Sequence, residues 1–124
     1  MNTIKVVWFE IPVANMDRAK AFYEAVFNTQ ILVHDLDGTI MGWFPGQDES
    51  AGAPGSLILH EQYKPSHDGT LVYLNSQELS LELSRVQAAG GKILQEKTMI
   101  SPEHGFMGLF QDTEGNRIAL HSTQ

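Results

Sequence analysis

The rhythm of apolar positions changes within residues 9–27, "FEIPVANMDRAKAFYEAVF". The residues up to Val13 are rich in β-forming types, and 4–12 are predicted to form a strand. Beyond Val13 the apolar side chains recur at helical spacing and form one stripe, made of Met16, Ala19, Phe22, Tyr23 and Val26. Asn15 is a good N-cap, and Asp17 suits the positive end of the helix. This stretch therefore predicts a strand followed by a helix.

Three further strands are predicted in the first half. Residues 30–35 and 39–44 predict a hairpin about Asp37-Gly38, a strong two-residue turn signal. Residues 47–55, "QDESAGAPG", are rich in residues that break regular structure and predict a loop. Residues 56–61 predict the fourth strand. The first half thus has the order β-α-β-β-β.

The second half predicts the same order. Its expected elements are a strand at 69–75, a helix at 78–89 that ends at Gly90-Gly91, and strands at 92–97, 106–112 and 116–122. An offset of 62 residues pairs Trp8 with Thr70 in the first strand of each half. The same offset pairs Asn28 with Gly90, and both types tolerate the left-handed backbone that ends a helix. The repeat lies in the pattern, because few identities are shared.

Two such modules predict one α+β domain over residues 1–124, with modules at 1–61 and 69–124. One face of each sheet takes its helix, so the other faces must meet or curl around something. We expect a half-open, mostly antiparallel, eight-stranded barrel-like cavity with the helices outside. Ligands favour concave places of this kind.

Composition narrows the classes of partner. The 124 residues are 42% apolar and 19% charged, with a formal net charge of -7. This charge argues against nucleic acid or an anionic membrane as partner, because both attract clustered Lys and Arg. The absence of cysteine excludes thiolate metal sites. No apolar run approaches the roughly 20 residues that span a bilayer, and no signal-peptide pattern opens the chain, so a cytoplasmic protein is expected.

The segments in this order resemble the vicinal oxygen chelate superfamily, which includes glyoxalase I, bleomycin-resistance proteins and extradiol dioxygenases. The resemblance is carried by residues 9–27, by "AAGGKIL" at 88–94 and by "GFMGLFQDTEGNRIALHS" at 105–122. One departure is Asn28, where a glycine usually follows the phenylalanine. Residues 61–69 are the predicted linker between the two modules. Members of the superfamily often pair modules across a two-fold axis, sometimes exchanging them between chains, so the resemblance implies a homodimer.

The resemblance also implies where a metal would bind. Metal-dependent members place four His, Glu or Gln ligands on the cavity face, and these positions fall on Trp8, Ile58, Thr70 and Ala119. Alanine and isoleucine offer no lone pair, tryptophan offers only a donor N–H, and a lone threonine hydroxyl is a poor ligand. The residues therefore argue against the family's metal chemistry, and no cofactor is expected.

A relocated metal site is the alternative. Glu10, His60 and His121 could all lie on cavity faces, and two histidines with a carboxylate suit iron or zinc. The other interpretation is that these are polar groups at strand ends that meet water.

The pleat of the first strand places Trp8 and Glu10 on one face, with Phe9 and Ile11 on the other, toward the helices. Trp8 is then either a plug that fills the barrel or a wall on which a ligand stacks. Glu10 is a candidate general base, with a solvated strand-end acid as the alternative. The remaining candidates for the cavity lining are Trp43, Thr70, Lys97, Met99, Phe106, Ala119 and His121.

Two further expectations concern the cavity walls. The loop between Lys97 and Phe106 is predicted to close the cavity as a lid, with Met99 in it. Lys97 could anchor an anionic ligand, with a plain surface lysine as the alternative. Tyr73 is predicted to face the helices and to belong to the core.

Three functions follow as hypotheses. The first is a small-molecule binding protein, or a metal-free enzyme, of the glyoxalase/bleomycin-resistance type. The second is a metal-dependent lyase or dioxygenase with relocated ligands. The third is a non-catalytic dimeric regulatory module whose cavity is filled by side chains.

Overall fold

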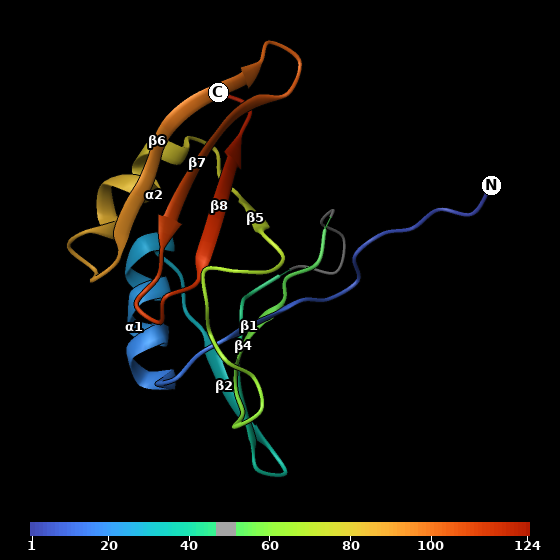
Figure 1. The fold of residues 1–124 in the computed structure, drawn as a ribbon, viewed down its shortest axis with the longest axis vertical. Helices are drawn as coiled ribbons and strands as arrows, with labels where there is room; N and C mark the ends of the chain where they lie inside the picture. The colour runs from blue at the N-terminus through green and yellow to red at the C-terminus, as the bar shows by residue number, and fades with distance from the viewer. Residues whose placement is uncertain (47–51) are drawn as a thin grey trace.

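The computed structural model describes residues 1–46 and 52–124 (Figure 1). The first module comprises β1 (Glu10–Pro12), α1 (Met16–Phe27), β2 (Leu32–Leu36), β3 (Thr39–Trp43) and β4 (Ser56–Leu59). The second comprises β5 (Val72–Asn75), α2 (Leu79–Val86), β6 (Lys92–Ser101), β7 (Gly105–Gln111) and β8 (Arg117–Ser122). The predicted α+β class and the repeated β-α-β-β-β order are confirmed. Of the predicted loop 47–55, residues 47–51 lie outside the described residues.

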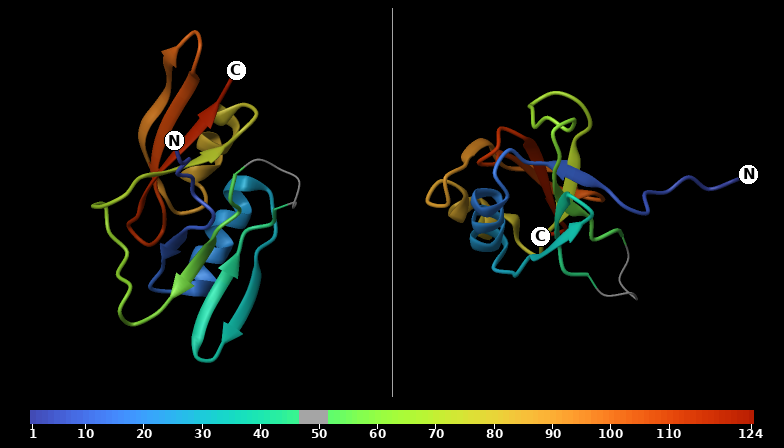
Figure 2. Two further views of the ribbon diagram at one scale, coloured as in Figure 1. Left: turned by 90° about the vertical axis from the view of Figure 1, so that its right-hand side faces the viewer. Right: turned by 90° about the horizontal axis from the view of Figure 1, so that it is seen from below.

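The two sheets have the same topology. The strand order is β1-β4-β3-β2 in one and β5-β8-β7-β6 in the other. The pairs β1–β4 and β5–β8 are parallel, and the other neighbours are antiparallel. Both helices lie on the same side of the sheets (Figures 1 and 2). The two sheets lie end to end and do not close into a barrel (Figure 1). The predicted half-open barrel is therefore an open surface formed by the two sheets.

Local signals in the first module act as predicted. The Asn15 side chain accepts a hydrogen bond from the amide of Arg18 at 3.0 Å and caps α1. Asn28 ends the helix in the left-handed conformation, with φ of 52°. At the hairpin, Asp37 and Gly38 both have positive φ, as a two-residue type I′ turn requires. These turns fix where the chain reverses.

The first strand is shorter than predicted, because residues 4–9 have no partner strand. Only Glu10–Pro12 pair with β4, in a register that sets Glu10 beside Ser56. Continuing this register would set Trp8 opposite Pro54, which has no amide hydrogen to donate. Gly55 also turns the chain away, with φ of 69°. The pairing therefore ends, and the preceding residues extend from the body as an arm (Figure 1).

Two predictions in the second module were wrong at element ends. The predicted lid 98–106 is mostly strand, because β6 continues to Ser101 and pairs Met99 with Phe106 of β7. Only a short turn at 102–104 separates the two strands. The helix α2 is also shorter than the predicted 78–89 and ends at Val86.

The core lies between the helices and the sheets and is shared by both modules. Phe22 of α1 packs on Phe110 of β7 with ring centroids 5.8 Å apart, and both are buried. Phe22 also meets Tyr23 edge to face at 5.1 Å. Aromatic pairs of this geometry contribute roughly 0.5–1.5 kcal/mol beyond the area they bury. Because the pair joins α1 to β7, the core holds the modules together.

A buried polar network joins the modules at the turn between β7 and β8. The Tyr23 hydroxyl donates to the Asp112 carboxylate at 2.6 Å. The other oxygen of this carboxylate accepts the amides of Glu114 and Asn116, each at 2.9 Å. The Asn116 side chain donates to the carbonyl of Pro12 in β1 at 2.7 Å. The second module is thus hydrogen-bonded to both α1 and β1 of the first module.

Glu114 extends this network to the start of α1. We call Tyr23, Asp112, Glu114 and Asn116 together the clamp. Its carboxylate accepts the amides of Ala14 and Asn15 at 2.8 and 2.9 Å, and Arg18 donates to it through Nε at 2.8 Å. Burial opposes ionisation of the side chain. The hydrogen bonds from Arg18, Asn15, Ala14 and Thr113 outweigh that effect and hold the pKa of Glu114 at about 2. A carboxylate here also suits the positive end of the helix dipole.

Replacing Tyr23 by phenylalanine tests the inner part of the clamp. Tyr23→Phe removes a donor from a buried carboxylate, so we expect the free energy of unfolding to fall by about 1–3 kcal/mol in urea titrations. Tyr73→Phe, at an exposed tyrosine, is the matched control and should change stability by less than about 0.5 kcal/mol. Equal effects of the two substitutions would contradict the role given to the Tyr23 hydroxyl.

The pH dependence of stability tests Glu114. Its pKa is lower in the folded chain than the ordinary value of 4.5, so its contribution is complete above about pH 4.5 and is lost as the pH falls toward 2. Glu114→Gln should cost on the order of 3 kcal/mol at pH 7 and little at pH 2.5. Urea titrations across this range measure the difference. A stability deficit that stays constant from pH 7 to pH 2.5 would count against the ionised clamp.

Candidate functional site

Each sheet has one face turned away from the helices, and we call the two together the open face. In the first sheet, a side chain added at Gly42 would meet Met16 of α1, and Leu57 beside it is buried in the core. Strand alternation therefore places Ser56 and Trp43 on the open face. In the second sheet, a side chain added at Gly108 would meet α2, so the neighbouring odd-numbered positions of β7 face the open side.

An aromatic cluster lies on the open face of the first sheet. Trp8 and Trp43 meet edge to face, with ring centroids 5.9 Å apart. The His34 ring lies 4.3 Å from that of Trp43. Trp8 is 38% exposed and Trp43 is 39% exposed. Trp8 therefore does not plug a barrel, and the two indoles, which we call the tryptophan pair, present an accessible wall.

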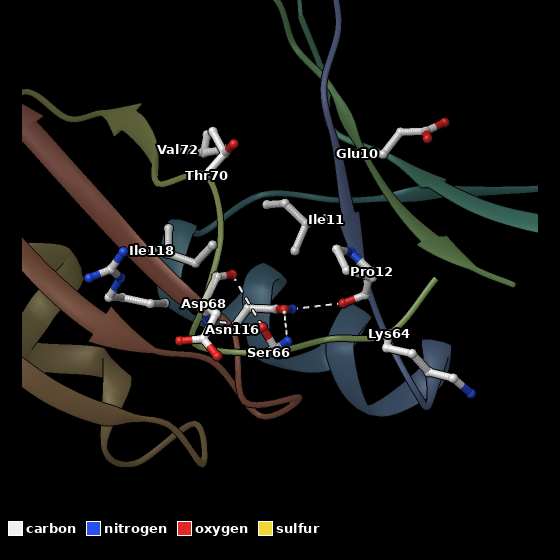
Figure 3. Close-up of a pocket in the computed structure, with 11 residues that line it drawn as sticks. Glu10, Ile11, Pro12, Lys64, Ser66, Asp68, Thr70, Val72, Asn116 and Ile118 are labelled. Carbon is white, nitrogen blue, oxygen red and sulfur yellow. Dashed lines mark hydrogen bonds between the residues drawn. The ribbon is translucent and has the colours of Figure 1, made fainter. Parts of the chain in front are cut away.

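A pocket of about 210 Å³ lies where the two sheets meet (Figure 3). Its walls come from β1 with Glu10 and Pro12, from the linker, and from the residues around β5 and β8, including Thr70 and Arg117. A second hollow of about 320 Å³ adjoins it and is lined by Glu10, Pro12, Ile58, Tyr63 and Lys64. The fold thus brings the candidate base Glu10 and the candidate Thr70 to one pocket.

The Asn116 side chain organises the floor of this pocket. Besides donating to Pro12, it accepts the amide of Ser66 at 3.1 Å and so ties the linker to both sheets (Figure 3). Four charged side chains line the pocket: Glu10, Lys64, Asp68 and Arg117. None of them forms an ion pair within the described residues. The pocket can therefore offer both signs of charge to a ligand.

The four positions that the resemblance assigns to metal ligands do not form a donor set. Ile58 and Ala119 are buried and apolar, and Trp8 belongs to the tryptophan pair. Over residues 1–46 and 52–124, no three His, Asp or Glu side chains gather where they could hold a metal ion. Thr70 alone of the four can offer an oxygen.

The relocated set is also not assembled. His121 lies on β8 with Nε2 2.6 Å from the carbonyl oxygen of His104. His60 accepts the amide of Gln62 through Nδ1 at 3.1 Å. Glu10 is exposed at the pocket rim. The alternative with Glu10, His60 and His121 as ligands therefore lacks the geometry that it requires.

Three candidates for the cavity lining lie on the opposite, helix-covered side of the second sheet. Phe106 packs against the core, and Met99 pairs with it in the register. The Lys97 ammonium lies 4.4 Å above the Phe106 ring and forms an ion pair with Glu78. Hydrogen bonds from Lys97 and Ser80 hold the pKa of Glu78 at about 2. Lys97 thus pairs with the N-cap residue of α2, on the side away from the open face where it was predicted to anchor a ligand.

Tyr73 shows the converse error. It was predicted to face the helices, but it is exposed and pairs with Ala119 on the open face. The strand "LVYLN" offers two apolar phases, 71 and 73 or 72 and 74, and the sequence does not distinguish them. The core takes Leu74, so Tyr73 faces outward.

Sequence reasoning missed His34, Ser56 and Arg117. Ser56 stands between Glu10 and Trp43 in the register of the first sheet. Only the pairing of three strands shows this neighbourhood, and no motif in the chain marks it. Arg117 falls within the predicted strand 116–122, and nothing in that segment of the sequence marks it as a pocket residue.

Comparison with known proteins places this geometry in a family. The family model for the Glyoxalase/Bleomycin resistance protein/Dioxygenase superfamily matches residues 5–120. A "Glyoxylase-like domain-containing protein" of Didymella fabae is 27% identical over 116 residues, which are 90% of this chain and 88% of that protein.

Two solved structures share the fold. Glyoxalase I of Zea mays superposes with a TM-score of 0.69 at 15% identity; the match covers 94% of this chain but only 45% of that one. TnmS3, an antibiotic binding protein from Streptomyces sp. CB03234, superposes with a TM-score of 0.63 at 22% identity, covering 100% of this chain and 99% of that one.

The structure adds one finding about membranes. No helix within the described ranges, 1–46 and 52–124, has the length and apolar character needed to span a bilayer. The family match extends over almost the whole chain, and the paired β-α-β-β-β modules have the fold of its solved members. This chain belongs to the Glyoxalase/Bleomycin resistance protein/Dioxygenase superfamily.

Proposed function

We propose that this chain binds a small organic molecule on the open face of the first sheet and in the adjoining pocket, without a metal ion. The observation that carries the proposal is the tryptophan pair. It places an exposed aromatic wall where the resemblance puts the first metal ligand. Stacking on indole rings favours a ligand with a planar or apolar body.

Unpartnered polar atoms beside the pair support a ligand with hydrogen-bonding groups. The hydroxyl of Ser56 and Nε2 of His34 are buried and have no hydrogen-bond partner. In the pocket at the junction of the sheets, Nε of Arg117 is in the same condition. Each unsatisfied group costs roughly 1–3 kcal/mol. A ligand that reached them would recover part of that cost, which a purely apolar ligand could not do.

A related structure is consistent with binding rather than catalysis. TnmS3 is described as an antibiotic binding protein and covers this chain from end to end. An enzyme is the second candidate, and a specific observation favours it: Glu10 is exposed at the rim shared by both hollows. A general base must reach a bound substrate, and Glu10 has that access. The family's metal-dependent reactions are less well supported, because the donor set is missing.

Intrinsic fluorescence offers a direct test, because the chain has two tryptophans and both belong to the pair. Bleomycin and 8-anilinonaphthalene-1-sulfonate serve as the probes, since the family description names one and the other is a generic anionic aromatic. We expect at least one to change the tryptophan emission saturably and to raise the melting temperature. A ligand present at 100 times its Kd stabilises by about 2.7 kcal/mol. The same titration after treatment with EDTA should be unchanged.

Variants locate the binding. Trp8→Leu should weaken the responding probe at least tenfold, because it removes half of the aromatic wall. Leu81→Ala, at an exposed apolar residue of α2 on the opposite side, is the control and should leave the Kd unchanged. A response abolished by EDTA would favour the metal-dependent candidate, and equal effects of the two variants would contradict the proposed site.

Ser56 permits a test that needs no ligand. Its hydroxyl is buried without a partner, so Ser56→Ala should leave the free energy of unfolding unchanged or raise it by up to about 1 kcal/mol. Asn116→Ala, at a buried side chain whose hydrogen bonds are made, should instead lower it by at least about 1 kcal/mol. A loss of stability in Ser56→Ala would show that the hydroxyl has a partner and is not free for a ligand.

A homodimer and a cytoplasmic location both remain predictions. The resemblance implies the first, and the sequence composition suggests the second.

A further inference from the structure

A hollow of about 350 Å³ lies where the two modules meet, on the side of the sheets that carries the helices. Phe44 and Leu74 line it, and both also pack against the core between helices and sheets. The hollow therefore faces away from the tryptophan pair, and we call it the helix-side hollow. Its other walls come from the end of α1, from the segments that flank β3 and β4, and from the start of α2: Phe27, Thr29, Pro45, Ala53, Pro54, Asn75, Ser76, Gln77 and Glu82.

Two phenylalanine rings form an aromatic wall of this hollow, and the core holds both of them in place. The Phe27 ring stacks on the Tyr23 ring with centroids 6.1 Å apart and an interplanar angle of 12°. The Phe44 ring meets Tyr23 edge to face at 5.5 Å. Tyr23 is buried, and its hydroxyl is fixed by Asp112. The aromatic wall is therefore ordered before any ligand arrives, which lowers the entropic cost of binding.

One carboxylate lies in the wall of the helix-side hollow. Among its lining residues in the described part of the chain, Glu82 is the only charged one. The Ser76 hydroxyl donates to Oε1 of Glu82 and so fixes the side chain beside the hollow. Within residues 1–46 and 52–124, Oε2 accepts no hydrogen bond and Glu82 forms no ion pair. The carboxylate thus has an oxygen available for a ligand.

The two helix ends at the hollow also favour a positive ligand. Phe27 and Thr29 lie at the C-terminal end of α1, which is the negative end of the helix dipole, and the last turn of α1 has no basic residue. The positive end of α2 is already neutralised by its N-cap, because the Glu78 carboxylate accepts the amide of Ser80 at 2.9 Å. An anion in the hollow would therefore find no cationic partner.

Arg85 is the basic residue nearest to Glu82 in the sequence, and it is engaged elsewhere. Its guanidinium donates to the carbonyl of Val26 at 2.9 Å. Arg85 is not among the residues that line the hollow. Because the chain has a net charge of -7, its overall field also attracts cations. Glu82 thus remains free to pair with a cation from solution.

We propose that the helix-side hollow binds a small organic ammonium ion, with the ammonium group at Glu82 and the apolar body against Phe27 and Phe44. Ligand pockets have volumes of about 300–1,000 Å³, so this hollow suits a small amine. Charge-assisted hydrogen bonds to a carboxylate and the attraction of cations to aromatic rings both favour this ligand class. The site goes beyond the proposed function and does not depend on it, because the tryptophan pair lies on the other side of the sheets.

Three probes that share one apolar body test the proposal. Phenethylammonium, phenethyl alcohol and hydrocinnamate each carry a phenyl group on a two-carbon chain, with a positive, a neutral and a negative end. In titrations followed by NMR, we expect the ammonium to bind about tenfold or more tightly than the alcohol, and the carboxylate not to bind. The backbone amide signals of Thr29 and of residues 75–77 should move, whereas the indole N–H signals of both tryptophans should not.

Variants test the role of the charge. Glu82→Gln keeps an oxygen that can accept from Ser76, so the fold should be retained. It should raise the Kd of phenethylammonium about tenfold or more and leave that of phenethyl alcohol unchanged. Glu103→Gln, at an exposed residue of the turn between β6 and β7, is the matched control. It makes the same change in net charge and should leave both Kd values unchanged.

Several results would overturn the proposal. Similar Kd values for all three probes would show that Glu82 does not select the charge of the ligand. Equal binding of phenethylammonium to Glu82→Gln would show the same. Signal changes confined to the open face, or none at the hollow up to the solubility limit of the ammonium salt, would place no ligand there. Failure of the fluorescence titrations would concern the open face alone, because neither tryptophan lines this hollow.

Discussion

The buried contact between Glu114 and the start of α1 fixes how the two modules stand to each other. It joins the β7–β8 turn to the amides of Ala14 and Asn15, and Asp112 beside it receives the hydroxyl of Tyr23. Since β1 continues directly into α1, the same contact sets the position of Glu10 against the second sheet. The walls of the pocket at the junction come from β1 and from the residues around β8, so the clamp that joins these elements helps to set its shape.

The two modules differ in how the start of their helix is held. The start of α1 is gripped by the other module, but the start of α2 is capped within its own module by Glu78, which Lys97 pairs with. Beside α2 a hollow of about 350 Å³ remains, lined in part by Phe44, Pro54 and Leu74. A carboxylate of the other module thus caps the start of α1, whereas no such side chain from the first module reaches the start of α2 within residues 1–46 and 52–59. Equivalent positions in a repeat need not keep equivalent chemistry.

The sequence predicted the elements that are decided locally. Asn15, Asn28 and Asp37-Gly38 each act through their own backbone and immediate neighbours, so the predicted caps and turn lie where the structure has them. It did not predict what a partner strand decides. The first strand begins only at Glu10, because Pro54 has no amide hydrogen to pair with the residues before it. The strand β6 continues to Ser101, because β7 provides backbone partners along that length. Of the candidate lining residues, Trp8 and Trp43 lie together on the open face, whereas Lys97 and Phe106 lie on the other face, where Glu78 and the core contact them.

The residues at the positions that the resemblance assigns to metal ligands suit contact with an organic molecule better than with an ion. An ion there would need charged donors and water, whereas Ile58 and Ala119 are buried and apolar and Trp8 lies against Trp43. The tryptophan pair is the apolar part of these surroundings that stays accessible, and each 100 Å² of such surface removed from water contributes roughly 2.5 kcal/mol before the cost of association. A ligand with an aromatic body would gain that free energy on contact with the indoles, whereas a small hydrated ion would not.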